Sequence, residues 1–100
     1  MTKQDMQTAI REAVKNLPER ERIQRISLFG SRLHGTEQPD SDIDLLIEFA
    51  KPIGYFGLYD IEQALEKALG SRVDLVTPKA ISKHFRYDVL REAQLLYEQP

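Results

Sequence analysis

The sequence predicts an α+β protein, a small mixed β-sheet flanked by helices, folded as a single domain over residues 1–100. Three observations predict this fold class. Apolar residues recur at helical spacing in three segments, and they alternate with other residues in three shorter segments. Helical and extended segments follow one another along the chain, as in proteins whose helices pack on a sheet. A chain of 100 residues is long enough to bury one hydrophobic core.

A first helix is expected over residues 2–17. Its apolar side chains recur every three or four residues: Met6, Ile10, Val14 and Leu17. Thr2 is a residue type that caps helices, and Asp5 in the first turn favours the helix dipole. Pro18 is expected to end the helix. The charged residues 19–22 are expected to form a solvated turn without a chemical role.

A first strand is expected over residues 23–29, because apolar side chains alternate along it. The strand stops at Gly30. A short helix is expected over residues 31–34, closed by Gly35, because glycine takes the left-handed conformation that ends many helices. Residues 36–40 contain a proline and polar side chains, so they are expected to be a loop.

A second strand is expected over residues 42–49, and its two faces differ in character. The face expected to meet the core carries three apolar residues: Ile43, Leu45 and Ile47. Asp42 and Asp44 fall on the other face, about 7 Å apart from the rise per residue of a strand. One face is therefore expected to be core, and the other to carry two acids.

The second half of the chain is expected to form a helix, a strand and a last helix. The apolar stripe of the first of these helices begins near residue 58, and Gly70 caps its end. The strand covers residues 72–77, ended by Pro78, with Val73 and Leu75 on one face and Asp74 and Val76 on the other. Ser82 is expected to cap the last helix. Its apolar positions are Phe85, Val89, Leu90, Ala93 and Leu96.

The composition narrows the classes of function. The chain contains no cysteine, which excludes disulfides and thiolate metal sites, and no apolar run approaches the roughly 20 residues of a membrane span. A formal net charge of −2 argues against stable nucleic-acid binding by bulk electrostatics, although a small, shape-specific RNA contact stays open. The amino terminus lacks the features of a signal peptide. We therefore expect a cytoplasmic protein without a membrane partner.

Gly30 and Ser31 lie between the first strand and the short helix, a place where backbone N–H groups can approach an anion closely. The Ser31 hydroxyl can donate to a phosphate oxygen, and Arg32 can reach a triphosphate. The alternatives are a plain turn with a serine cap and a solvated arginine. The common glycine-rich nucleotide motifs are absent. His34 and His84 have no partner at ligand spacing and are expected to be surface residues.

Asp42 and Asp44 are the strongest indication of chemistry. Aspartate is depleted in strands, and two on one face repel each other unless a cation lies between them. Carboxylate oxygens suit Mg²⁺ or Mn²⁺, and a pair of such ions can stabilise the attacking and leaving oxygens of a phosphoryl displacement. The alternative is a solvated edge strand, where like charges are tolerated.

Asp74 is a third acid on an otherwise apolar strand. If its strand lies next to the strand of Asp42 and Asp44, Asp74 faces the same site. It can then bind a catalytic ion and accept the proton of an incoming hydroxyl. A single aspartate on a strand is usually exposed and inert. Asp74 therefore indicates a functional site only together with the other two acids.

A calcium-binding EF-hand loop is a competing interpretation of the same residues. Asp40, Asp42 and Asp44 match the opening of such a loop. However, its sixth position is Leu45 where glycine is needed, and its twelfth is Lys51 where glutamate is needed. The flanking residues are also typical of a strand, which argues against this interpretation.

The motif as a whole resembles the signature of the DNA polymerase beta-like nucleotidyltransferase superfamily. It consists of Gly30-Ser31, ten intervening residues, and Asp42-Ile43-Asp44. The chain is similar in length and element order to the short members, the minimal nucleotidyltransferases, from the first helix through residues 72–76. The individual parts are common, but their combination with a third acid on a later strand is specific. The resemblance implies a small palm-like fold, as in polymerase beta.

The resemblance also implies an activity. Such enzymes use ATP or another NTP with two Mg²⁺ ions and transfer a nucleoside monophosphate to an acceptor. The equivalents of Asp42 and Asp44 bind both ions, and the equivalent of Asp74 binds the catalytic one. The equivalents of Gly30 and Ser31 contact the triphosphate. Minimal members are commonly antitoxins that pair with a helical HEPN ribonuclease toxin and inactivate it by adding AMP to a tyrosine.

Two hypotheses follow for this chain. The first is a Mg²⁺-dependent nucleotidyltransferase that adenylylates a partner HEPN toxin, with which it forms a hetero-oligomer, because a chain this short has no separate acceptor-binding domain. The second is a binding module that neutralises its partner by masking it, without transfer. A nucleotidyltransferase that acts on a small molecule or on tRNA is a weaker third alternative, because the net charge is −2 and the chain is short.

Overall fold

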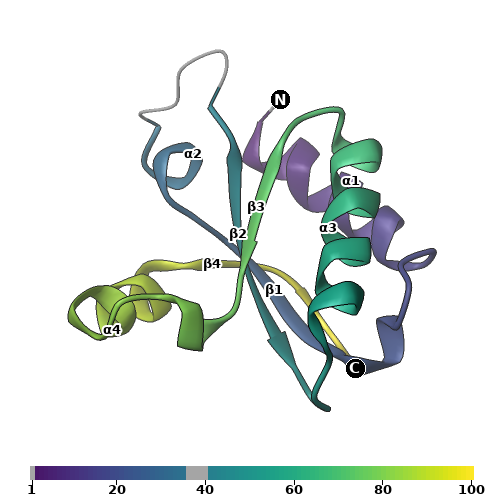
Figure 1. Cartoon of the computed structure of the whole chain (residues 1–100). Helices are drawn as coiled ribbons and strands as arrows, with labels where there is room; N and C mark the ends of the chain where they lie inside the picture. Colours follow the sequence, from purple (N-terminus) through teal and green to yellow (C-terminus); the bar gives the residue numbers. More distant parts are fainter. Residues whose placement is uncertain (1, 36–40) are drawn as a thin grey trace.

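The computed structural model describes residues 2–35 and 41–100, with the backbone alone for residues 31 and 32. Its centre is a four-stranded mixed sheet in the order β3-β2-β1-β4 (Figure 1). In chain order the elements are α1 (Lys3–Val14), the 3-10 turn η1 (Arg20–Arg22), β1 (Ile23–Phe29), α2 (Ser31–His34), β2 (Ile43–Phe49), α3 (Tyr55–Leu69), β3 (Val73–Val76), the 3-10 turn η2 (Pro78–Ala80), α4 (Lys83–Glu92) and β4 (Gln94–Glu98). The predicted α+β class is confirmed. Among the described residues, no helix is long and apolar enough to cross a membrane.

The hydrophobic core lies between one side of the sheet and the helices α1 and α3, whereas α2 and α4 lie on the opposite side (Figure 1). Strand β2 places its predicted apolar face in this core: Ile43, Leu45 and Ile47. Helix α3 presents one buried side chain per turn: Ile61, Leu65 and Leu69. We call the side of the sheet that carries α2 and α4 the open side.

Helix α1 begins as predicted and ends earlier than predicted. The Thr2 hydroxyl accepts from the Asp5 N–H, and the Asp5 carboxylate accepts from the Thr2 N–H, which lowers the pKa of Asp5. The expected end at Leu17 is wrong, because the regular helix stops at Val14. The Leu17 N–H bonds to the Val14 carbonyl at 3.1 Å, a tighter turn that carries the Leu17 side chain into the core.

The strands pair in two ways. Strand β1 is antiparallel to both β2 and β4, whereas β2 and β3 are parallel. A parallel pair needs a long crossover connection, and α3 supplies it. Because α3 also packs on the core, the same helix that buries apolar surface sets the position of β3 beside β2.

The last predicted helix is correct up to Glu92 and wrong in its last residues, 93–96. Helix α4 begins after the predicted cap Ser82 but ends at Glu92, because Ala93 takes an extended conformation with ψ 136°. The chain continues as β4, which pairs with β1 and buries Leu96 completely. The spacing of Val89, Ala93 and Leu96 fits a helix, yet a free edge of β1 offers Leu96 a place in the core. Tertiary pairing therefore overrides the local pattern.

Both outer strands of the sheet are covered by side chains of the core helices. On β3, the Glu66 carboxylate accepts from the Val73 N–H at 2.9 Å, and the Glu62 carboxylate accepts from the Leu75 N–H at 3.0 Å. On β4, Arg11 of α1 donates to the Leu96 carbonyl at 3.3 Å. Unpaired edge groups invite pairing with another chain, so these contacts protect both edges.

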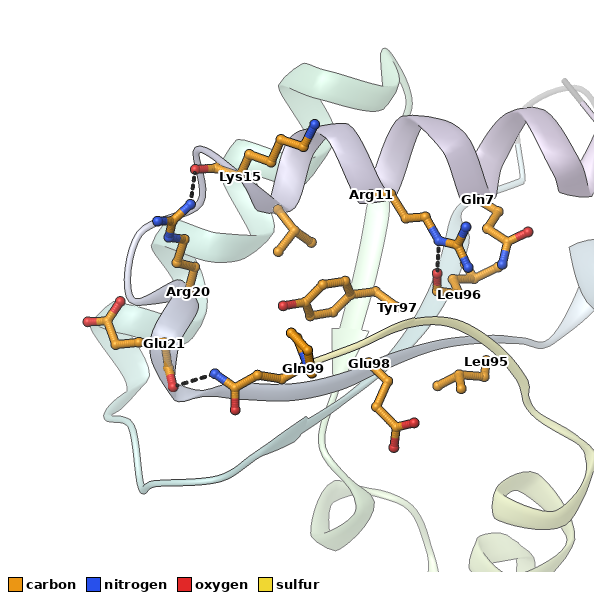
Figure 2. A pocket seen from close by; sticks show the side chains of 12 residues that line it. Gln7, Arg11, Lys15, Arg20, Glu21, Leu95, Leu96, Tyr97, Glu98 and Gln99 are labelled. Carbon is orange, nitrogen blue, oxygen red and sulfur yellow. Dashed lines mark hydrogen bonds between the residues drawn. The ribbon is translucent and has the colours of Figure 1, made fainter.

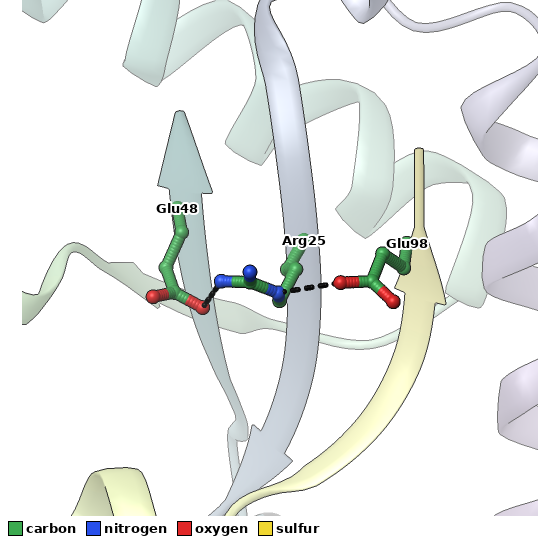
Figure 3. A network of polar contacts seen from close by, with 3 residues as sticks. All are labelled: Arg25, Glu48 and Glu98. Carbon is green, nitrogen blue, oxygen red and sulfur yellow. Dashed lines mark hydrogen bonds and ion pairs between the residues drawn. The ribbon is translucent and has the colours of Figure 1, made fainter. Parts of the chain in front are cut away.

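A charged cluster joins three strands on the open side. Arg25 of β1 donates to Glu98 of β4 at 2.7 Å and to Glu48 of β2 at 3.3 Å (Figure 3). The hydrogen bond that Arg25 donates to Glu98, followed by the one that it donates to Glu48, raises the pKa of Arg25. Since all three side chains contact solvent, this cluster aligns the strands and adds little to stability.

The observed strand β4 makes a prediction about two adjacent leucines. Leu96→Ala should lower the free energy of unfolding by about 2–4 kcal/mol, because it removes a completely buried side chain. Leu95→Ala should cost less than about 1 kcal/mol, because Leu95 is 44% exposed on the other face. Urea unfolding of both variants measures the difference, and equal losses would argue against the strand.

Candidate functional site

Two of the three predicted acids lie directly opposite each other. Strands β2 and β3 are neighbours, and the Cα atoms of Asp44 and Asp74 are paired in the parallel register. Paired residues of adjacent strands point to the same side of a sheet. The flanking Val73 and Leu75 enter the core, so Asp74 projects from the open side, where it is exposed. The structure thus brings two carboxylates from separate strands together.

Helix α3 holds the strand of Asp74 in place. Val73 and Leu75, whose N–H groups donate to the two glutamates, lie on either side of Asp74 along the chain. Both hydrogen bonds are partly buried and charge-assisted, which makes them stronger than neutral ones. They fix the outer edge of β3, while pairing with β2 fixes its inner edge. The direction of Asp74 therefore depends on Glu62 and Glu66.

Gly30 lies against the side chain of Asp44. A Cβ atom at Gly30 would stand 2.9 Å from the Cγ of Asp44 and 3.1 Å from its Cβ, too close for either pair of atoms. Gly30 also has a φ of 76°, a left-handed conformation that favours glycine. The glycine turn and the carboxylate strand are consequently in direct contact, although fourteen positions separate them along the chain.

The turn at Gly30 leads directly into α2. The N–H groups of Leu33 and His34 donate to the Gly30 carbonyl at 3.1 and 3.3 Å, so the short helix starts at this glycine. Gly35 follows α2 with a φ of 72°, as predicted for a helix end. The side chains of Ser31 and Arg32 and the loop of residues 36–40 lie outside the described residues. The expected contacts of the Ser31 and Arg32 side chains with a triphosphate stay predictions.

Asp42 is placed differently from the other two acids. It immediately precedes β2, and its carboxylate lies 3.8 Å from the Nε of Arg72, which immediately precedes β3. The pairing of Ile43 with Val73 brings these two preceding residues together. The sequence analysis missed Arg72 as a neighbour of the site. The signal that could have identified Arg72 is the parallel pairing of Ile43 with Val73, because it places the residue before each of them side by side.

The chemistry of these acids fits a divalent cation, but their arrangement is not a finished metal site. Carboxylate oxygens are the donors that Mg²⁺ prefers, and Asp44 and Asp74 approach from adjacent strands. Within the part of the chain that the structure describes, no three acidic, histidine or cysteine side chains are gathered closely enough to hold a metal ion. The Asp42 carboxylate lies beside Arg72, and metal binding by the three acids stays a prediction.

The two histidines are exposed, as expected of surface residues. His34, however, has a partner that the sequence analysis missed. Its Nε2 atom lies 3.4 Å from a carboxylate oxygen of Glu92, at the end of α4. The two residues are 58 positions apart, and no local spacing relates them. Only the placement of α4 on the open side brings them together.

Two cavities of the protein lie away from these acids. One, of about 900 Å³, lies between α1 and β4, and its lining includes Arg11, Lys15 and Tyr97 (Figure 2). The other, of about 730 Å³, lies beside the start of α3. The described residues that line them include none of the predicted site residues. The acids therefore stand on the open side of the sheet rather than in either cavity.

The chain is similar to known nucleotidyltransferases in sequence. Residues 11–100 match the family described as polymerase beta, nucleotidyltransferase. A protein adenylyltransferase MntA from Thermococcus cleftensis is 33% identical over 92 residues, which are 92% of this chain and 93% of that protein. A protein adenylyltransferase MntA from Shewanella oneidensis is 33% identical over 82 residues, which are 82% of this chain and 57% of that protein.

Solved structures agree in fold. A minimal nucleotidyltransferase is 38% identical with a TM-score of 0.75, and the match covers 93% of this chain and 94% of that one. A toxin–antitoxin structure with AMP-PNP is 28% identical with a TM-score of 0.75, covering 93% and 73%. The MNT antitoxin in complex with a tri-AMPylated HEPN toxin, from Shewanella oneidensis, is 25% identical with a TM-score of 0.68, covering 96% and 72%.

The contact between Gly30 and Asp44 predicts unequal effects at two glycines. Gly35→Ala should cost about 1–2 kcal/mol of unfolding free energy, because Gly35 is left-handed but has open space around it. Gly30→Ala should cost about 1–3 kcal/mol more, because its methyl group also displaces Asp44. Urea unfolding compares the two variants. Similar losses would mean that Asp44 moves aside freely.

The glutamates of α3 predict a second stability difference. Glu62→Ala should lower the unfolding free energy by about 1–3 kcal/mol, because the partly buried Leu75 N–H loses its acceptor. Gln63→Ala is the matched control, an exposed position on the same helix, and should change it by less than about 0.5 kcal/mol. Amide exchange at Leu75 should quicken in Glu62→Ala alone. Slow exchange in that variant would show that β3 does not depend on Glu62.

Proposed function

The chain belongs to the polymerase beta nucleotidyltransferase family, as one of its minimal members, and from this premise we propose the reaction that it catalyses. It is a nucleotidyltransferase, and we infer that its donor is ATP. We infer further that its acceptor is a tyrosine hydroxyl of a HEPN-type toxin, which it inactivates as the antitoxin of a pair. The observation that carries this proposal is the pairing of Asp44 with Asp74 beside Gly30.

The proposed step is an in-line displacement at phosphorus. The tyrosine oxygen attacks the α-phosphorus of ATP, the bond to the oxygen that bridges the α- and β-phosphates breaks, and pyrophosphate leaves. Asp74 projects from the open side and accepts the proton of the attacking hydroxyl. The turn at Gly30 offers its backbone to the triphosphate, next to Asp44.

Magnesium completes the proposed site. When bound, it supplies positive charge that stabilises the attacking and leaving oxygens. Asp44 and Asp74 would hold it from adjacent strands, and Asp42 would join them once its carboxylate leaves Arg72. Oxygen ligands alone favour Mg²⁺ or Mn²⁺ over softer metals, which is consistent with a chain that contains no cysteine.

A protein acceptor fits the shape of this site. The acids stand on the side of the sheet opposite to α1 and α3, where Asp74 is exposed. A large partner can reach Asp74 there without entering either of the two cavities. The relatives support a HEPN partner, because one of them is a protein adenylyltransferase by name and another is solved with a tri-AMPylated HEPN toxin.

The proposal is tested with ATP labelled on its α-phosphate, Mg²⁺ and a HEPN-type protein encoded beside this chain. Label should appear on a tyrosine, and EDTA should abolish the transfer. Asp44→Asn and Asp74→Asn should each slow it by at least about a hundred-fold, because each removes a ligand or a base. Asp60→Asn, on the exposed face of α3, is the control and should transfer normally.

Two outcomes would contradict the proposal in different ways. Label that arrives from the γ-phosphate of ATP and not from the α-phosphate would indicate a kinase rather than a nucleotidyltransferase. Neutralisation of the toxin by the Asp44→Asn and Asp74→Asn variants, without ATP, would indicate that the chain acts by masking its partner.

A further inference from the structure

Helix α4 is attached to the rest of the chain in an unusual way. None of its residues is buried, and Phe85 and Tyr87 are 63% and 71% exposed. An isolated helix of ten residues is only marginally stable in water. Helix α4 therefore depends on specific contacts with the rest of the chain. The first is Arg86, which donates to the carbonyls of residues 78, 79 and 81 at 2.8, 3.3 and 3.1 Å.

These carbonyls belong to the segment that directly follows β3, the strand of Asp74. The first half of α4 is thus fixed to one side of the reaction site. The last residue of the helix, Glu92, lies 3.4 Å from His34. His34 ends α2, whose amides bond to the Gly30 carbonyl. The second half of α4 is thus fixed to the other side of the site, and Figure 1 shows α2 and α4 on the same side of the sheet.

We infer that Glu92, acting through His34, is a positioning residue for ATP. It holds α2, and with it the turn at Gly30, at a set distance from the strand of Asp74. Helix α4 then acts as a strap between the two sides of the site, with Arg86 at one end and Glu92 at the other. This inference rests on the proposed function, because it assumes that the turn at Gly30 binds the triphosphate.

The other charged groups near α2 are on β2 and α4. The acids of the site lie on the same side of the sheet, whereas Arg91 is occupied by Asp88 at 3.3 Å and stacks on Tyr87. Arg25 and Glu48 lie at the far end of their strands.

The expected effect on nucleotide binding is modest. Both partners are about half exposed, 56% and 52%, and an exposed pair changes an equilibrium by about two- to five-fold. Loss of the pair should therefore raise KM for ATP by this factor. It should leave kcat nearly unchanged, because neither residue touches the reacting atoms.

The test compares Glu92→Gln with Asp88→Asn, a matched carboxylate-to-amide change on the outer face of the same helix. Binding of Mg²⁺-ATP is measured in the absence of an acceptor. Asp88→Asn should bind as tightly as the wild-type chain, and Glu92→Gln should bind about two- to five-fold more weakly than both.

Charge reversal gives a sharper test of the same contact. His34→Glu should weaken binding, because it places two carboxylates together. The double variant His34→Glu with Glu92→Lys should restore binding. No rescue by the double variant, or Glu92→Gln binding equal to that of Asp88→Asn, would overturn the inference.

Amide exchange separates this inference from the proposed function. Exchange at the N–H of Leu33 and of His34, which bond to Gly30, should quicken in Glu92→Gln and not in Asp88→Asn. If the wild-type chain binds no ATP, the proposed function fails, and this exchange still decides whether Glu92 holds α2. Equal exchange in both variants would reject the strap even if ATP binds.

Discussion

The parallel pairing of β2 with β3 is the constraint on which the site depends. It sets Asp44 opposite Asp74, and it brings Asp42 beside Arg72 at the ends of the same strands. Parallel strands are not joined by a tight turn, so this register depends on the crossover through α3. The same helix packs on the core and provides the glutamates that hold the outer edge of β3. Core burial and site geometry are therefore set by one element.

The contact of Gly30 with Asp44 joins the remaining half of the site to this pair. It explains why a glycine stands at the end of β1, since the left-handed backbone and the nearby carboxylate each exclude a side chain. The two faces of β2 have different roles. One face stabilises the protein through buried isoleucine and leucine, and the other carries the acids. A one-residue slip in register would exchange these faces and abolish both properties.

The open side of the sheet is less tightly built than the core side. Its helix α4 buries no residue of its own, and its described attachments are polar, at Arg86 and at Glu92. Such contacts are individually weak and can be rearranged at small cost. An open side of this kind suits a nucleotidyltransferase whose acceptor is another protein, because the partner must come close to the acids. The rigid core behind the sheet then keeps the carboxylates in register while the partner binds.

Local chemistry was sufficient to predict the elements of the first three quarters of the chain, apart from the end of α1, and the motif that carries the candidate site residues. Alternation in Ile43, Leu45 and Ile47 is an intrinsic property of a strand, and Gly30, Asp42 and Asp44 lie within one short motif. Tertiary structure alone decided three things: the pairing of Asp74 with Asp44, the strand β4, and the contact of His34 with Glu92. These three features have the same physical reason. Each depends on which distant segment offers a partner, and Leu96 became part of a strand because β1 had an unpaired edge beside the core.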